Sequence, residues 1–484
     1  MPALLSDRGR RRAAAHRSHE GDVVSLSSYQ VATLIATIAI VVLVSHAVGG
    51  LFARFRQPVV VGEILAGLIF GPTLLGLVAP DIQHLLFPKT GPVAAVLAGL
   101  AQLGLLLLMF ITGGELRLTG VARDRRTISL VTVTGLVLPF SIGVAVVSAI
   151  DHRDLAGPAG TQTTTILVFA IAVAVTSIPV ISRIMLDLGL LGGSFARIVL
   201  GVAALEDIAL YVVLAIVLSL ASAPATEFGL WDLIGIHTTG WTVGYHTAVT
   251  VVFLTAFMVW GPQVFRYLLY GRPGVLARRN ATAYRLVLLL ITVLLCTMLG
   301  INPIFGALLT GVCARRAEPE QELDGSATAT EQTNSWITIR RFSLAFFIPI
   351  YFFTVGLGLN LVQDFDVLFF AWFFALCCVV KAASVLLGAV LAGERLRWSI
   401  DLSIALNARG GPGIVLATTT LAAGVVNRSF YTSMVVLSVL TSLIAGIWLD
   451  RRATALRQAD LERARDPKVP QAVTAGGEHA GTAT

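Results

Sequence analysis

Long apolar stretches separated by short polar segments recur along the chain from about residue 29 to residue 449. Most of them approach the roughly 20 apolar residues with which an α-helix crosses a hydrocarbon core. The pattern predicts an all-α polytopic membrane protein with about 13 transmembrane helices. The predicted spans are 29–51, 58–78, 92–113, 127–149, 163–184, 196–221, 243–265, 283–300, 302–314, 342–361, 366–393, 398–424 and 429–449.

The polar segments define the rest of the chain. Residues 1–28 form an N-terminal tail, and residues 29–449 form the membrane domain. A polar stretch at about 315–341 is expected to be a flexible cytoplasmic connector. Residues 450–484, rich in Ala, Gly, Thr and charge, are expected to be a disordered cytoplasmic tail. We expect no soluble domain, such as a nucleotide-binding domain, after the membrane domain.

The distribution of charge predicts the orientation. Only 13% of the residues are Asp, Glu, Lys or Arg, about half the share that is usual in soluble domains. The loops after odd-numbered spans are rich in Arg, whereas those after even-numbered spans hold only Lys89, Arg153 and Arg428. The positive-inside rule therefore predicts a multi-pass protein of the cell (plasma) membrane with its C-terminus in the cytoplasm and its N-terminus outside. The N-terminal tail is itself basic, which contradicts an outside location. Either the internal loops outweigh the tail in setting the orientation, or one span is miscounted, and we favour the first explanation.

Composition argues against several kinds of site. The excess of Arg lies in short loops, so the basic charge indicates topology and no nucleic-acid partner. The four cysteines and eight histidines show no spacing typical of a zinc or redox site. We therefore expect no cofactor and no metal beyond a transported monovalent cation.

Two parts of the chain resemble each other. The segment "PVVVGEILAGLIFG" from Pro58 resembles "PIFGALLTG" from Pro303, and "FITGGELRL" from Phe110 resembles "FTVGLGLNL" from Phe353. The offset covers an odd number of spans, so the second copy is inserted upside down. The two inverted repeats are expected at about 58–221 and about 302–449, an arrangement typical of secondary transporters.

The fourth element of each repeat is interrupted. "AVTSIPVISR" places Pro179 in the fifth span, and "ALNARGGPGIVLA" places Gly410, Gly411, Pro412 and Gly413 in the twelfth. Pro and Gly open the hydrogen-bond ladder of a helix. Freed backbone groups at membrane depth are tolerated only beside protein or water, where they can help to hold an ion. Two ordinary Pro kinks are the alternative, but the matched positions favour a binding site.

Two adjacent acids, Glu206 and Asp207, lie in the apolar sixth span, "GVAALEDIALYVVLAIVLS". At 1.5 Å per residue they lie roughly 14 Å from its cytoplasmic end, near the middle of a ~30 Å hydrocarbon core. A charge there is costly unless it faces a wet cavity or a partner. We expect one acid to pair with a cation and the other to bind the transported ion.

Lys381 is the candidate partner of one acid. It also lies near the midplane, and it is one of three lysines in a chain with 32 arginines. A buried Lys can release its proton whereas Arg stays charged, so Lys suggests titration here. Arg409, in the second break, is expected to compensate freed carbonyls or to pair with an acid. The acids nearer the cytoplasm, each either a helix-terminus partner or part of an inner mouth, are Glu63, Glu115 and Asp401.

These parts permit ion exchange at a single site. A carboxylate in a wet midplane cavity binds a cation or a proton, but not both strongly, because burial disfavours its charged form. If one bundle rocks against the other only when the site is occupied, the cation moves one way and protons the other. No enzyme chemistry is needed.

Other functions stay open at this point. A cation-coupled symporter or a proton-driven exporter of a small organic substrate would use a related fold with a larger polar cavity. A gated cation channel would carry current without obligatory proton coupling. An intramembrane protease is disfavoured, because adjacent acids on one helix point about 100° apart.

The same segments resemble those of the monovalent cation:proton antiporter-2 family, which includes the Kef-type and plant cation/proton exchangers. "QPVVVGEILAGLIFGPTLLG" from Gln57 is similar to the opening signature of that family. "GINPIFGALLTG", "FFIPIYFFTVGLGLNL" and "LNARGGPGIVLA" are similar to later signatures, and the resemblance covers about residues 29–449. It implies the sodium/proton antiporter-like fold with crossed discontinuous helices, and exchange of Na⁺ or K⁺ for H⁺ across the lipid bilayer. It also implies homodimers, each protomer having a dimerisation part and a core part.

The resemblance also implies roles for single residues. Asp207 would be the main ion- and proton-binding carboxylate, assisted by Thr176, Ser177 and nearby carbonyls. Glu206 stands where relatives have Asp, Asn or Gln, and an Asp there commonly pairs with the lysine that matches Lys381. The Glu is a departure that leaves the stoichiometry open, although an acid pair with a lysine favours more than one proton per cation. The Gly-rich "NARGGPG" is a second departure, and it bears on ion preference.

Overall fold

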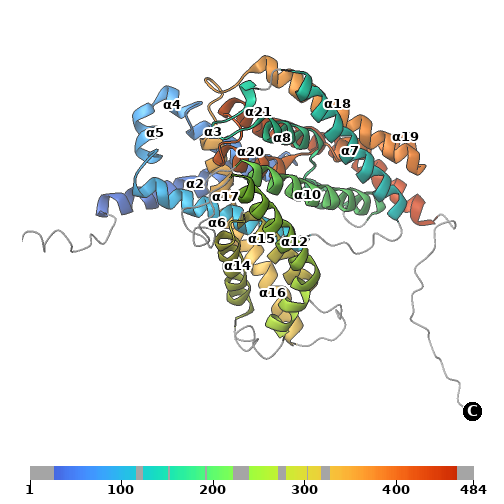
Figure 1. Ribbon diagram of the computed structural model, residues 1–484, viewed down its shortest axis with the longest axis horizontal. Coiled ribbons are helices and arrows are strands. Elements are labelled where there is room, and N and C mark those ends of the chain that lie inside the picture. The colour runs from blue at the N-terminus through green and yellow to red at the C-terminus, as the bar shows by residue number, and fades with distance from the viewer. Residues whose placement is uncertain are drawn as a thin grey trace, which may run out of the picture.

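The computed structural model describes residues 27–115, 124–150, 153–190, 193–221, 239–270, 280–301, 303–317 and 327–465. These residues form a helical protein, and the only β-type pairing among them is an isolated bridge between Ala156 and Val426. Figure 1 shows the helices crossing one another at several angles rather than forming one parallel bundle.

Nine helices of the described residues are long and apolar enough to cross a membrane. They are Ser28–Arg54, Val59–Val78, Pro92–Gly114, Arg125–Ala149, Ser194–Leu218, Ala281–Met298, Ser335–Leu357, Val367–Ala392 and Arg428–Leu461. The other four predicted spans correspond to two broken helices, to the 32-residue helix Thr239–Tyr270 and to the 14-residue helix Pro303–Arg316. The prediction of a polytopic all-α membrane protein is therefore confirmed.

The first 270 residues supply the helices up to α12. They are α2 (Ser28–Arg54), α3 (Val59–Phe70), α4 (Leu75–Val78), α5 (Pro80–Leu86), α6 (Pro92–Glu115), α7 (Arg125–Ala149), η1 (Arg153–Leu155), α8 (Gln162–Ala174), α9 (Ile178–Asp187), α10 (Ser194–Leu220) and α12 (Thr239–Tyr270). Local sequence sets their starts. Ser27 and Thr161 each form a capping box, at the first turns of α2 and α8.

The second half supplies the remaining helices. They are α14 (Ala281–Met298), α15 (Pro303–Arg316), α16 (Ala327–Phe342), the π-helical segment η3 (Ser343–Phe347), α17 (Ile348–Leu357), α18 (Val367–Ala392), α19 (Leu396–Ala405), α20 (Gly410–Ala422) and α21 (Arg428–Arg465). The Asp366 carboxylate accepts from the backbone N–H groups of Leu368 and Phe369 and so caps α18.

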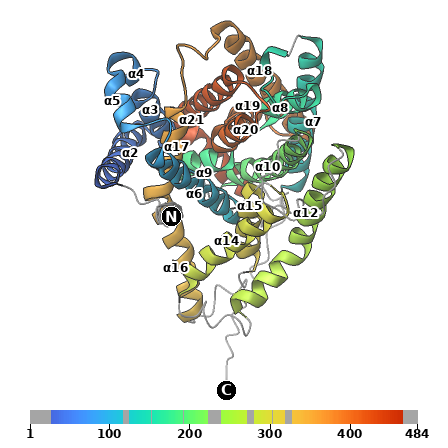
Figure 2. The same ribbon diagram turned by 60° about the vertical axis from the view of Figure 1, so that its left-hand side comes forward.

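The helices pack as two groups. The scaffold group comprises α2, α3, α6, α14, α15, α16, η3 and α17, and the crossing group comprises α7, α8, α9, α10, α18, α19, α20 and α21. The elements of each group pack mainly on one another, and α12 touches both groups, through α10 and α15. In Figure 2 the α2, α3 and α5 helices of the N-terminal part lie on one side, and α7, α8 and α18 lie on the other.

Close glycine contacts in the scaffold group repeat the sequence symmetry. A Cβ on Gly67 of α3 would overlap the carbonyl oxygen of Phe353 in α17, and one on Gly311 of α15 would overlap that of Phe110 in α6. Gly67 and Phe353 match Gly311 and Phe110 in the aligned repeats, so the two contacts are equivalent. The α3–α17 and α6–α15 pairs are therefore symmetry-related. In each pair, a helix of the first repeat packs on a helix of the second repeat.

Two predicted boundaries are wrong. The connector expected at 315–341 is helical from Ala327. This helix packs on the scaffold through Trp336, because the centroid of its ring lies 5.0 Å from that of Phe110 and 6.0 Å from the Arg285 guanidinium. The tail expected to be disordered from 450 is helical as far as Arg465, because its side chains bond to the membrane helices. One such bond runs from the Ser194 hydroxyl to the Asp460 carboxylate at 2.6 Å. Residues 1–26 and 466–484, the bulk of both predicted tails, lie outside the described residues.

Candidate functional site

The first broken helix comprises α8 and α9. α8 ends at Ala174, the backbone of Val175 is extended, and α9 starts at Ile178. Pro179 is the second residue of α9, a position at which a helix tolerates Pro because no intrahelical N–H bond is lost. The chain therefore frees the last carbonyls of α8 and the first N–H groups of α9 within the protein.

The second broken helix comprises α19 and α20. α19 ends at Ala405, and α20 begins with the run Gly410, Gly411, Pro412 and Gly413. Gly410 has a φ of +31°, a conformation in which a Cβ would be strained. The predicted interruption of the twelfth span is present, and the glycines form the first turn of its second half.

The two breaks contact each other directly. The backbone N–H of Ser177 donates to the Ala408 carbonyl at 2.8 Å, and the Thr176 hydroxyl donates to the Leu406 carbonyl at 2.6 Å. Each break thus supplies hydrogen-bond partners to the other, which is how irregular backbone is tolerated at membrane depth. The sequence prediction of crossed discontinuous helices is confirmed by these bonds.

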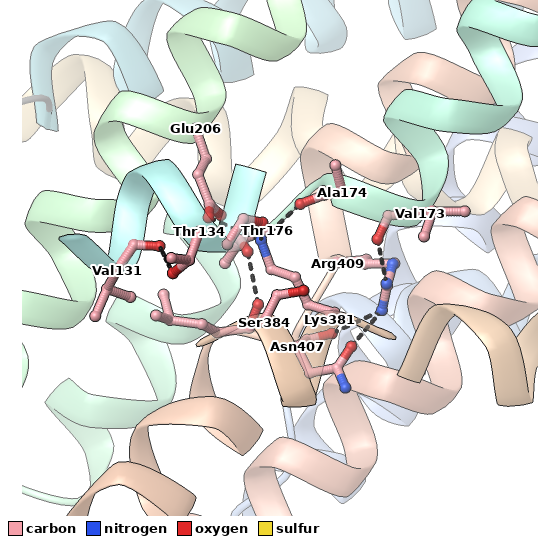
Figure 3. A network of polar contacts seen from close by, with 12 residues as sticks. Val131, Thr134, Val173, Ala174, Thr176, Glu206, Lys381, Ser384, Asn407 and Arg409 are labelled. Atoms are coloured by element: carbon pink, nitrogen blue, oxygen red, sulfur yellow. Dashed lines mark hydrogen bonds and ion pairs between the residues drawn. The ribbon is translucent and has the colours of Figure 1, made fainter. Parts of the chain in front are cut away.

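Arg409 ties both breaks to a third helix. Its guanidinium donates to the carbonyls of Ala172 and Val173 in α8, at 3.2 and 2.9 Å, and to that of Cys377 in α18 at 3.0 Å. It also donates to the carbonyl and the side-chain oxygen of Asn407, and Figure 3 shows it between Val173 and Asn407. Of the two predicted roles, compensation of freed carbonyls is the one observed.

Glu206 is paired with Lys381, as predicted. The Lys381 ammonium donates to Glu206 Oε1 at 2.8 Å, and both side chains have 0% exposure. The same ammonium donates to the Ala174 carbonyl at 2.6 Å, at the end of α8, and to the Gly135 carbonyl at 2.8 Å in α7. The amine therefore uses its three protons on one carboxylate and two carbonyls, and it joins α7, α8, α10 and α18 (Figure 3).

Asp207 is the acid without a cation. It is 1% exposed, and neither carboxylate oxygen has a hydrogen bond of ordinary geometry. The backbone N–H of Ile178, at the start of α9, lies beside it. The Ser177 hydroxyl oxygen and Glu206 Oε2 are also buried without a partner. Four oxygen atoms with free lone pairs therefore belong to residues at the first break and on the helix that faces it, which is a donor set suited to a hard cation or a proton.

The three acids assigned to an inner mouth have different surroundings. Asp401 accepts from Arg452 at 3.0 Å and from the Trp448 indole at 2.9 Å, so it pairs with α21 and not with Arg409. Glu63 is 4% exposed, and its Oε2 has no hydrogen-bond partner. The side chain of Glu115 lies outside the described part of the chain.

Two hydroxyl residues at the second break were not predicted. The backbone N–H of Arg409 donates to Thr441 Oγ1 at 3.3 Å, and that of Gly410 donates to Ser442 Oγ at 3.2 Å. Both hydroxyls belong to α21. The sequence offered only a weak signal, because the same span contains a second adjacent hydroxyl pair, Thr432 and Ser433.

Comparisons with known proteins agree with this geometry. The family described as "Sodium/hydrogen exchanger, transmembrane" matches residues 35–453. The Na(+)/H(+) antiporter NhaS4 of Synechocystis is 28% identical over 426 residues, which are 85% of this chain and 95% of that protein. The Na(+)/H(+)-K(+) antiporter GerN of Bacillus cereus is 23% identical over 84% of this chain and 93% of its own length. Cation/H(+) antiporter 15 of Arabidopsis thaliana is 27% identical, and the chain spans about half of it, 47%.

A solved structure shares the fold. The sodium proton antiporter MjNhaP1 from Methanocaldococcus jannaschii superposes with a TM-score of 0.57 at 12% identity, covering 89% of this chain and 99% of that one. The residues matched by the family, 35–453, include both broken helices. The chain therefore belongs to the sodium/hydrogen exchanger transmembrane family.

Proposed function

We propose that this protein exchanges a monovalent cation, Na⁺ or K⁺, for protons across the membrane, with Asp207 as the carboxylate that the two ions share. The observation that carries the proposal is the contrast between the two adjacent acids. Glu206 is held by Lys381 at 2.8 Å, whereas both oxygens of Asp207 lie buried and without a partner beside the first break. A buried carboxylate in that position needs a proton or a cation.

Ser177, Thr176 and Glu206 assist this site. The Ser177 hydroxyl oxygen is free to accept or to coordinate, and Thr176 holds the two breaks together through the Leu406 carbonyl. Oxygen ligands of this kind suit hard cations. Lys381 is bonded to Glu206 and to carbonyls, and Arg409 is bonded to carbonyls. Both therefore compensate charge while leaving Asp207 as the group whose occupancy changes.

The orientation of the protein in the membrane follows from the same charge distribution that the sequence shows. We place the Arg-rich loops and the end of α21 in the cytoplasm, and the end of α10 outside, from the distribution of Arg along the chain. We also infer a homodimer from the family resemblance, with the scaffold group as the dimerisation part and the crossing group as the moving part.

Relatives named for antiport of Na⁺, of K⁺ and of both support the exchange of a monovalent cation. The family consists of transporters, which sets aside the intramembrane protease. A symporter, an exporter of an organic substrate and a gated channel are distinguished from antiport by whether an imposed proton gradient collapses when the cation is added alone.

The test is reconstitution of the chain into lipid vesicles with a trapped pH-sensitive dye. Addition of Na⁺ or K⁺ should dissipate an imposed proton gradient, and Asp207→Asn should abolish this. Asp81→Asn, which changes an exposed carboxylate at the start of α5, serves as the matched control and should leave exchange intact. Exchange by Asp207→Asn at the rate of the unmodified chain would remove Asp207 from the mechanism. Cation flux without proton movement would favour a channel.

A further inference from the structure

Three tyrosine hydroxyls bridge the scaffold group and the crossing group. Tyr351 of α17 lies 3.3 Å from the Thr418 hydroxyl of α20. Thr418 already donates its only hydroxyl proton within its own helix, to the Ile414 carbonyl at 3.0 Å. Tyr351 is therefore the donor of the bond between the groups.

The other two bridges have the same character. The Tyr431 hydroxyl of α21 donates to the Val355 carbonyl of α17 at 3.4 Å, and the Tyr211 hydroxyl of α10 donates to the Met109 sulfur of α6 at 3.1 Å. Tyr211, Tyr351 and Tyr431 are only 3%, 5% and 5% exposed. All three rings are thus buried where the two groups meet.

The bridges lie on one side of the ion site. Tyr211 follows Asp207 by one helical turn, toward the end of α10. On α21, Tyr431 and Asp450 are about 28 Å apart at 1.5 Å per residue, close to the thickness of a hydrocarbon core. Ser442, which bonds to the second break, lies between them. Tyr431 and Asp450 therefore lie toward opposite membrane faces, and Tyr211 lies on the Tyr431 side of Asp207.

An ion pair that joins the two groups at the opposite face is of another kind. Asp450 pairs there with Arg56, just after α2, at 2.7 Å, and the two side chains are 68% (Arg56) and 33% (Asp450) exposed. An exposed ion pair of this kind contributes little to stability, because water and salt screen it. The tyrosine bridges are buried, whereas the ion pair of Arg56 and Asp450 at the other face is exposed to solvent.

We propose that the hydroxyl bridges of Tyr211, Tyr351 and Tyr431 form the gate that closes access to Asp207 from the face at which α10 ends. This inference rests on the proposed exchange function, and it assigns the gate to the hydroxyls rather than to the rings. Neutral hydrogen bonds suit a gate, because each can break and re-form at a small net cost when one group moves against the other. Under the proposed orientation this is the outer gate, and these tyrosines position the helices rather than bind the ion.

Tyr351→Phe tests the gate, since it keeps the ring and removes the bridge. A net hydrogen bond contributes about 1 kcal/mol, so its loss should raise the fraction of protein molecules that are open at that face about fivefold. The apparent affinity for the cation at that face should rise by the same factor. The cation concentration that half-saturates exchange should fall about fivefold in right-side-out membrane vesicles and stay unchanged in everted ones. No change, or an equal change in both vesicle types, would overturn the gate.

Two further variants separate the bridge from packing. Thr418→Val removes the acceptor of the same bond, so it should give the same one-sided shift, and the double variant should add nothing further. Additive shifts would show that Tyr351 and Thr418 act independently, and would overturn the assignment of the gate to their hydrogen bond. Tyr267→Phe, on a ring that is 61% exposed, is the control and should shift neither side. An unmodified chain that exchanges no ions would overturn the proposed function, and the gate with it.

Discussion

The two broken helices are related by the inverted repeat, yet their surroundings differ. At the first break, the start of α9 faces an acid: the Ile178 N–H lies beside Asp207, and the Ser177 hydroxyl has no partner. At the second break, the start of α20 faces hydroxyls, and the N–H groups of Arg409 and Gly410 are bonded to Thr441 and Ser442. The first break therefore retains free polar atoms, whereas the N–H groups of Arg409 and Gly410 at the second break have partners.

The difference shows how one symmetric architecture provides both a site and a support. Both breaks free backbone groups, which must find partners inside the membrane. The second break supplies Arg409, whose guanidinium satisfies carbonyls of α8 and α18. The first break can then keep unpartnered oxygens for an ion, because the neighbouring carbonyls are already bonded.

Loss of the Arg409 guanidinium is expected to have the largest effect. Arg409→Met keeps much of the apolar stem but leaves buried carbonyls of Ala172, Val173 and Cys377 without these donors. Each unsatisfied buried acceptor costs about 1–3 kcal/mol, so a loss on the order of 4 kcal/mol in the free energy of unfolding is expected. Thermal unfolding of the purified protein in detergent, followed by tryptophan fluorescence, measures it.

The matched control for this change is Arg397→Met. Arg397 is exposed at the start of α19, so its replacement should change the unfolding temperature little. If Arg409→Met unfolds at the same temperature as Arg397→Met, the guanidinium network does not support the two breaks. The contrast between a supporting break and a binding break would then be lost.

A methyl group at the contact between the breaks should have the next largest effect. A Cβ at Gly410 would lie 2.8 Å from the Ser177 hydroxyl oxygen and would overlap Val180, at a residue with a φ of +31°. Gly410→Ala should therefore displace the free Ser177 hydroxyl at the first break and raise the cation concentration needed for half-maximal exchange by about tenfold, which corresponds to 1.4 kcal/mol of lost binding. Dye-loaded vesicles measure this concentration directly.

The neighbouring residue provides a control within the same turn. A Cβ at Gly411 would meet no atom within 4 Å, and its φ is not in the positive range. Gly411→Ala should therefore leave cation affinity as it is. Equal effects of the two substitutions would mean that flexibility of the glycine run, rather than the space beside Ser177, governs the site.

The predictable parts of this arrangement are those that depend on residue types and on patterns local in the sequence. Apolar length gave the spans, Gly and Pro marked both breaks, and a rare lysine at the midplane predicted the pair with Glu206. The partners of Arg409 were not decided, because carbonyls and acids are equally acceptable acceptors and only the fold selects between them. The helical continuation to Arg465 was missed, because its composition is polar and its partners, such as Ser194, lie far away in sequence.

The hydroxyls of α21 were missed for a different reason, and they supply the smallest expected effect. A Ser or Thr in a membrane helix commonly donates to its own helix, as Ser442 does to the Ser438 carbonyl at 2.7 Å, so the residue type alone does not predict a second bond. The second bond, from the Gly410 N–H to Ser442 at 3.2 Å, gives the first N–H group of α20 a partner.

Ser442→Ala should lower the free energy of unfolding by about 1 kcal/mol, the net value of a typical hydrogen bond. Ser433→Ala, on the same helix, removes a buried hydroxyl that has no partner and should be neutral. If the two serine variants unfold at the same temperature, the Ser442 bond does not stabilise the second break. The contrast between a break whose groups have partners and one with free oxygens would then be lost.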